Sequence, residues 1–256
     1  MRIRTAILLL ASTALLAFSC TKDNGSYGYL FPNALVTAKT TDDGVFYLQL
    51  DDKTKLQPTN MSKSPFDTEM RALVNVSISR ESADVKDGGV FTSTDRKARI
   101  NAISKVLTKS TVPTEGDTSK DDEKYGKAPL ELINNWVTVV EDGYLTVCFY
   151  AVWGYEQNTH YINLVTGTNP NDPYELVLRH DANGDTIAGG GREVTSIAAF
   201  SLKDLPDTNG ETVKLKIKFN SFTGEKTVNF DYCTGAATGK GSQLPLSSVN
   251  TNLSIE

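Results

Sequence analysis

The run from residue 29 to residue 60 alternates apolar and polar side chains between tight-turn residues, which restricts it to paired β-strands. Alternate positions from 34 to 38 and again from 46 to 50 are apolar. Between them, Asp43-Gly44 tolerates the positive φ of a hairpin turn. A second turn at residues 51–53 leads to a short strand that Pro58 ends. The pattern therefore predicts that the folded part of the chain begins with a β-hairpin.

The residues before this run have the features of an export signal. Two arginines precede an apolar run, residues 6–18, that is too short to span a bilayer and ends in small residues before Cys20. A cysteine in this place is typical of a lipobox, so residues 1–19 are predicted to be a signal peptide and Cys20 the lipidated first residue of the mature chain. An ordinary signal peptide with an incidental cysteine is the alternative, because Ala17 stands where the motif usually has leucine.

The predicted location is the outer membrane, in which the lipid on Cys20 would anchor the protein. A diacylated cysteine supplies enough buried acyl chain for stable anchoring. Residues 20–28 are polar, as a tether should be. Residues 21–24, Thr-Lys-Asp-Asn, partly resemble the short signal that sends some bacterial lipoproteins to the cell surface. This segment is compatible either with a signal that sends the protein to the cell surface or with the start of a simple tether.

After the leader, the chain divides into two β-rich units around an acidic segment. Residues 98–112 fit either a bent strand or a helix segment, and their β-branched side chains favour the strand. Residues 113–128 hold few apolar and many acidic side chains, which predicts a solvated linker. The first domain is therefore expected to span residues 29–112 and the second residues 129–256.

Strand patterns fill the second unit without a long helix. They cover residues 136–140, 144–153, 160–165, 174–180, 192–200, 213–219 and 227–233. Short strands at this spacing favour a β-sandwich. The polar tail that follows is predicted either to be loosely ordered or to add one last edge strand.

Three segments of the opening run, FPNALVTAKT, DGVFYLQLDD and LQPTN, resemble the NigD-like family of Bacteroides-type lipoproteins. The resemblance implies an all-β architecture, with a small OB-like N-terminal barrel followed by a C-terminal β-sandwich. The residue pattern alone predicts only a small all-β unit for the first part. The family has no established biochemistry, and its association with a bacteriocin locus makes an immunity role one hypothesis.

Charge is shared unevenly between the two units. Residues 28–112 hold 12 basic and 10 acidic side chains, whereas residues 128–256 hold 8 and 15. A basic cluster on an OB-like barrel can indicate nucleic-acid binding, and here the cluster comprises Arg96, Lys97, Arg99, Lys105 and Lys109. The small charge excess argues against nucleic acid and favours contact with the acidic second domain or an anionic glycan.

The sequence predicts no catalytic residue, cofactor or metal. Residues 180–185 place oxygens as a calcium loop does, but Arg192 stands where the chelating glutamate belongs, so an Asn-Gly hairpin turn explains them better. His160 and His180 lack a close third metal ligand in sequence. Three glycines at 189–191 are not followed by a helix start or a phosphate-loop lysine, so a bulge or turn is expected.

A possible disulfide between Cys148 and Cys233 is left open. Strand parity places both thiols with the more polar faces of their strands. A bridge between them requires those strands to be neighbours. Neither cysteine has a nearby histidine that would indicate a nucleophile.

Aromatic residues are dense from residue 144 to residue 161, and some of them must point away from one core face. Tyr150 and Tyr155 are therefore candidate contacts for a partner. The alternative is a central strand that is covered on both faces. The predicted function is a non-enzymatic binding module for an extracellular or periplasmic protein or glycan, with a bacteriocin-immunity protector as the alternative.

Overall fold

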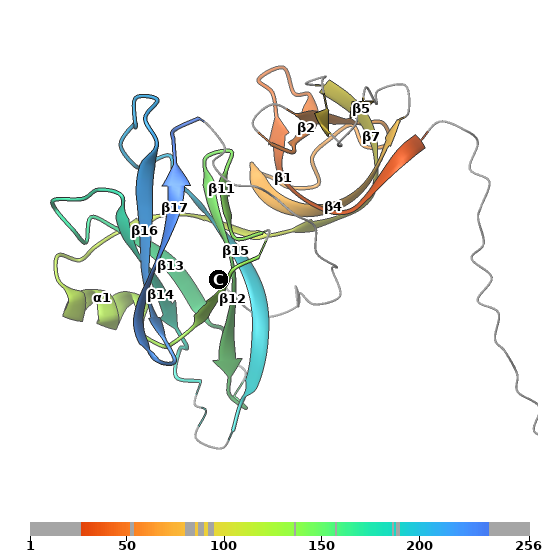
Figure 1. Cartoon of the computed structure of the whole chain (residues 1–256). Coiled ribbons are helices and arrows are strands. Elements are labelled where there is room, and N and C mark those ends of the chain that lie inside the picture. The colour runs from red at the N-terminus through yellow and green to blue at the C-terminus, as the bar shows by residue number, and fades with distance from the viewer. Residues whose placement is uncertain are drawn as a thin grey trace, which may run out of the picture.

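In the computed structural model, the described residues form two β-domains and one short helix (Figure 1). The signal peptide, Cys20, Trp136 and the tail after residue 235 lie outside the described part of the chain. The structure describes residues 27–51, 54–79, 85–86, 90–91, 95–135, 137–156, 158–185, 187 and 190–235.

The first domain is a closed five-stranded barrel with the order β1-β2-β3-β7-β4. Its strands are β1 (Tyr27–Thr40), β2 (Phe46–Gln49), β3 (Lys55–Pro58), β4 (Met70–Ser79) and β7 (Asp95–Lys105), and β5 (Val85–Lys86) and β6 (Val90–Phe91) form a separate pair. Gly44 has a φ of 81°, as the expected turn requires. Alternate residues such as Val36, Leu48 and Val74 fill the barrel. The predicted hairpin and the small barrel are both confirmed.

The second domain is a sandwich of two sheets. One sheet has the order β10-β12-β15-β8, with β11 also paired to β12, and the other has the order β17-β16-β14-β13-β9. The strands are β8 (Leu107–Ser110), β9 (Val112–Pro113), β10 (Glu131–Ile133), β11 (Val139–Glu141), β12 (Tyr144–Trp153), β13 (Tyr161–Thr166), β14 (Glu175–Asp181), β15 (Arg192–Ser201), β16 (Val213–Ser221) and β17 (Gly224–Tyr232). Their inward side chains form one apolar core that includes Phe149 and Phe200. The predicted β-sandwich is thus confirmed.

The chain that leaves the barrel becomes an edge strand of both sandwich sheets. The strand interpretation of residues 98–112 is correct, but this stretch divides into three strands. β8 pairs in parallel with β15, and β9 pairs in parallel with β13. Residues 107–112, expected at the end of the first domain, and Pro113, expected in the linker, therefore belong to strands that pair with the second domain.

The acidic segment expected to be a solvated linker instead contains a packed helix, α1 (Thr118–Tyr125). Asp117 caps the helix by accepting a hydrogen bond from the Lys120 amide. Asp121 is buried because its carboxylate accepts bonds from the Thr114 hydroxyl and the Glu115 amide, each at 2.7 Å. The prediction of a solvated linker is wrong because composition does not show that Asp121 accepts hydrogen bonds from nearby residues. These bonds allow its carboxylate to be buried.

The Asn183-Gly184 turn is present, but it does not close a hairpin. Both residues have positive φ, 49° and 75°. The strands on either side, β14 and β15, belong to different sheets, so the turn begins a crossing between sheets. Farther along, a Cβ on Gly191 would lie 2.4 Å from Val152 Cγ1, so this glycine permits close approach of the returning chain.

Candidate functional site

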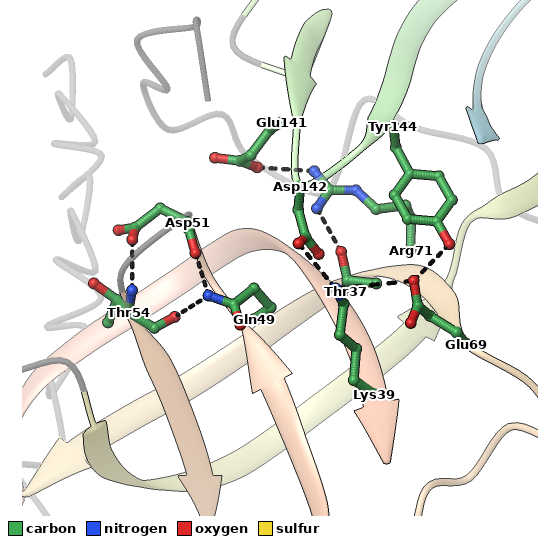
Figure 2. A network of polar contacts seen from close by, with 10 residues as sticks. All are labelled: Thr37, Lys39, Gln49, Asp51, Thr54, Glu69, Arg71, Glu141, Asp142 and Tyr144. Carbon is green, nitrogen blue, oxygen red and sulfur yellow. Dashed lines mark hydrogen bonds and ion pairs between the residues drawn. The ribbon is translucent and has the colours of Figure 1, made fainter. Parts of the chain in front are cut away.

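The turn between β11 and β12 carries side chains of the second domain that contact the first domain. Its tip is Asp142-Gly143, with φ values of 50° and 76°. This is the left-handed geometry of a tight hairpin turn, and it joins the strand patterns predicted at residues 136–140 and 144–153. Glu141, Asp142 and Tyr144 each contact a different residue of the barrel (Figure 2).

Arg71 is the buried centre of these contacts. Its guanidinium donates to Thr37 Oγ1 and to Glu141 Oε2, each at 2.9 Å. The Arg71 side chain is fully buried, whereas that of Glu141 is 15% exposed. A guanidinium withdrawn from water in this way depends on its carboxylate partner.

Two further contacts flank Arg71. Lys39 Nζ donates to Asp142 Oδ1 at 2.9 Å, and the Tyr144 hydroxyl donates to Glu69 Oε1 at 2.8 Å (Figure 2). Burial raises the pKa of Tyr144, and the bond to the Glu69 carboxylate raises it further. Tyr144 therefore remains a neutral donor at physiological pH.

An apolar cluster lies beside the polar contacts and joins the domains. The barrel contributes Leu35, Leu73 and Val106, and the sandwich contributes Val137, Val139, Tyr144, Cys148 and Ala199. This packing covers the first part of β12 on the face that points away from the sandwich core, at Tyr144 and Cys148. Farther along the same face, Tyr150 is only half-buried, so β12 is covered on both faces over part of its length.

A cleft of about 730 Å³ lies next to this junction and takes its walls from both domains. Thr68 and Glu69 come from the barrel side, and Lys203 and Thr234 come from the sandwich. The remaining lining residues are Thr108, Lys109, Ser110, Asp142, Gly143, Tyr144, Ser201, Leu202, Leu205, Tyr232 and Gly235. Its volume is in the range of small-ligand sites, and its position between domains is a common place for one.

The structure separates the predicted site residues from this cleft. Tyr155 is 74% exposed and touches the position where a side chain on Gly190 would stand. Tyr150 is half-buried and stacks on Phe222 with ring centroids 5.7 Å apart. Neither tyrosine lines the cleft.

Cys148 and Cys233 are both free, so the possible disulfide between them is not formed. Cys148 lies in the apolar cluster between the domains, and burial raises the pKa of its thiol. Cys233 follows β17 in the other sheet, where its sulfur contacts the Thr208 hydroxyl. Cys148 lies, as its strand parity predicts, on the face of β12 opposite Val147 and Phe149, but the barrel covers that part of the face.

The basic residues of β7 and β8 do not form one surface. Arg96 is buried in the barrel, whereas Lys97 and Arg99 are exposed. Lys109 Nζ donates to the Ile162 carbonyl and to Asn163 Oδ1. The cluster seen in sequence is therefore split by strand alternation and by bonds into the sandwich.

Within the described residues, no group of three or more His, Cys, Asp or Glu side chains is arranged to hold a metal ion. Over the same part of the chain, no helix is long and apolar enough to cross a membrane.

Comparison with known proteins identifies relatives for both domains. Residues 35–106 match the model of the NigD-like N-terminal OB domain, and residues 110–232 match that of the NigD-like C-terminal beta sandwich domain. The chain is similar to a Parabacteroides distasonis protein described as toxin-related, with 33% identity, a TM-score of 0.64, and coverage of 80% of this chain and 94% of that one.

Two more solved structures share the fold at lower identity. A NigD-like immunity protein of Bacteroides caccae is 19% identical, with a TM-score of 0.52 over 80% of this chain and 99% of that one. A Bacteroides fragilis protein described as a lipoprotein is 12% identical, with a TM-score of 0.51 over 79% and 97%. Comparison with curated proteins gives no match.

Proposed function

The chain belongs to the NigD-like family, and from that premise we propose that it is a lipid-anchored, non-catalytic envelope protein that binds a partner in the cleft between its domains. The single observation that carries the proposal is that both domains build the cleft. Partly buried polar contacts and an apolar cluster fix the two walls beside it. A site held in this way is preorganised, which lowers the entropy lost on binding.

The chemistry of the cleft suits a protein segment better than a glycan. Sugar recognition usually exposes the face of an aromatic ring, but Tyr144 and Tyr232 are only 8% and 4% exposed. Exposed groups include the Glu69 carboxylate and the Lys203 amine. These groups can bind the charged side chains of a peptide, and nearby hydroxyls can bind its backbone.

The cleft can be tested by site-specific photo-crosslinking in cells of the native host. A photoreactive phenylalanine analogue at Lys203 is expected to capture one discrete protein, and Thr68→Trp should abolish the adduct by filling the mouth of the cleft. Asp67→Trp is the matched control, because the neighbouring Asp67 is exposed but does not line the cleft. Equal capture from an analogue at Glu123, on the exposed side of α1, would contradict the proposal.

A glycan partner at the exposed ring is the competing outcome. Retardation of the protein in gels containing soluble polysaccharide, abolished by Tyr155→Ala and unaffected by Thr68→Trp, would move the binding site to Tyr155. Turnover of a substrate by the purified chain would overturn the non-catalytic part of the proposal.

A bacteriocin-immunity role is the second candidate. It is favoured by the similarity to a protein described as toxin-related and to a NigD-like immunity protein. Immunity through the cleft requires that expression of the chain raises survival against one particular bacteriocin and that Thr68→Trp removes the protection. Protection that survives this substitution would separate immunity from the cleft.

The proposed location is the outer membrane, through the lipid at Cys20, as the lipoprotein relative also suggests. We expect protease to reach the protein on intact cells, and access to be lost when residues 21–24 are all changed to alanine. The control is the same digestion after the outer membrane is permeabilised. Digestion of the wild type only after permeabilisation would place the protein in the periplasm.

A further inference from the structure

The only two histidines of the chain touch each other inside the sandwich, far from each other in sequence. His160 Nδ1 lies 2.8 Å from His180 Nε2, and the two side chains are buried. His160 Nε2 lies 3.1 Å from Asp185 Oδ2, and His180 Nδ1 lies 3.2 Å from the carbonyl oxygen of Pro129. These contacts form one continuous chain from a buried carboxylate to a backbone carbonyl.

This chain of contacts joins several elements at one end of the sandwich. The Gly154 amide, just after β12, also donates to Asp185 Oδ2 at 2.9 Å. Trp153 stacks on His160 with ring centroids 4.0 Å apart and planes 10° apart. Asp185 closes the turn after β14, since its amide donates to the Ala182 carbonyl. Both sheets and the 182–185 turn therefore meet at these residues.

Each of the three contacts needs one proton for a hydrogen bond, but two neutral imidazole rings supply only two. An ionised Asp185 only accepts, so His160 must carry its proton on Nε2, and its Nδ1 must accept from His180 Nε2–H. His180 Nδ1 is then unprotonated and faces the Pro129 oxygen, so two lone pairs oppose each other. A third proton would complete the chain but would place an imidazolium in apolar surroundings.

Burial and the surrounding charges decide whether the rings take up the third proton or stay neutral. Burial, together with the smaller effect of His160, lowers the pKa of His180 to about 4, against the raising effect of the Pro129 and Ala128 backbone and of Asp181. Burial also lowers the pKa of His160, although Asp185 and Asp181 oppose this. Burial raises the pKa of Asp185, but the bonds from His160 Nε2 and the Gly154 amide, with a side-chain contact to Glu156, outweigh it and hold the pKa below the usual value.

We propose that Asp185, His160 and His180 form a proton-linked junction that fastens the 182–185 turn and both sheets at the end of the sandwich and opens on acidification. The closed junction binds fewer protons than the open one, because burial disfavours the imidazolium form of both rings. Its stability is therefore full above the ordinary histidine pKa of 6.5 and declines as the pH falls below it.

The experiment is a pH titration of the full chain labelled with ¹⁵N only in histidine, which yields four ring-nitrogen signals. At pH 7.5 both rings should be neutral and protonated at Nε2. In a second sample labelled uniformly with ¹⁵N, hydrogen exchange of the Gly154 amide, corrected for its intrinsic rate, should rise roughly ten- to thirty-fold between pH 7.5 and pH 5. Two rings that titrate independently near pH 6.5, or that carry their protons on Nδ1, would overturn the proposal.

Substitutions give an independent check. His180→Gln removes one of the two titrating rings and should reduce the pH dependence of Gly154 exchange to the part that His160 contributes. Asp181→Asn is the matched control, because Asp181 lies near both rings but has no hydrogen bond to either, and it should keep both tautomers. The wild-type tautomers decide the question even where His180→Gln does not fold.

Discussion

Replacing Glu141 with alanine is expected to lower the free energy of unfolding by about 3–5 kcal/mol. The change leaves the fully buried guanidinium of Arg71 without the carboxylate that it contacts at 2.9 Å. An uncompensated charge in the protein interior is far less favourable than the same charge in water. Chemical denaturation, followed by far-UV circular dichroism, measures the loss.

Removing both Arg71 and Glu141 is expected to lower the free energy of unfolding much less than removing either residue alone. Replacing both residues, as Arg71→Met with Glu141→Leu, should recover most of the stability, because no charge then remains buried. The matched control is Lys214→Ala, which breaks an exposed ion pair with Asp231 and should change the stability by less than about 1 kcal/mol. A Glu141→Ala effect as small as that of Lys214→Ala would show that water reaches Arg71.

The sequence predicts each domain well because each strand buries one face in its own domain. In β12, residues 145, 147 and 149 alternate inward, and the predicted bounds of the strand, 144–153, are those observed. The opening hairpin was equally clear, since its turn depends on the local pair Asp43-Gly44. Such features are set by neighbours in sequence and are visible without the fold.

The site between the domains was missed because it depends on pairs more than 60 residues apart. Glu141 and Arg71 are 70 positions apart, and Lys39 and Asp142 are 103 apart. A local signal was nevertheless present, because Leu73 stands on the otherwise polar face of β4. A second such leucine, Leu35 of β1, is its cross-strand partner. Two paired leucines outside a barrel indicate a surface that another domain covers.

The histidine pair shows the same limit. The sequence argues against a metal site at His160 and His180, because no third ligand is close to them in sequence. The structure brings them together because β13 and β14 are antiparallel neighbours, so the start of β13, next to His160, lies beside the end of β14, which contains His180. Their partner Asp185 lies in the segment that was compared with a calcium loop, and its carboxylate is used internally.

Leu73→Ala is expected to destabilise the protein by about 2–5 kcal/mol and to uncouple its domains. Leu73 is 4% exposed and lies in the apolar cluster to which both domains contribute, so its loss removes packing between the domains and leaves the barrel core intact. Because both tryptophans, Trp136 and Trp153, belong to the second unit, their fluorescence reports on the sandwich, whereas far-UV circular dichroism reports on both domains. The two denaturation curves should coincide for the wild type and separate in this variant.

The adjacent residue provides the matched control for this result. Val74 faces the interior of the barrel and is fully buried, so Val74→Ala should lower stability by about 2 kcal/mol while leaving the contact between the domains in place. Its two curves should therefore shift together. Coincident curves for Leu73→Ala would mean that the ion pairs of Arg71 and Lys39 alone keep the domains cooperative. Separated curves in both variants would mean that the cleft has walls that move independently, and it could not then be a preorganised site.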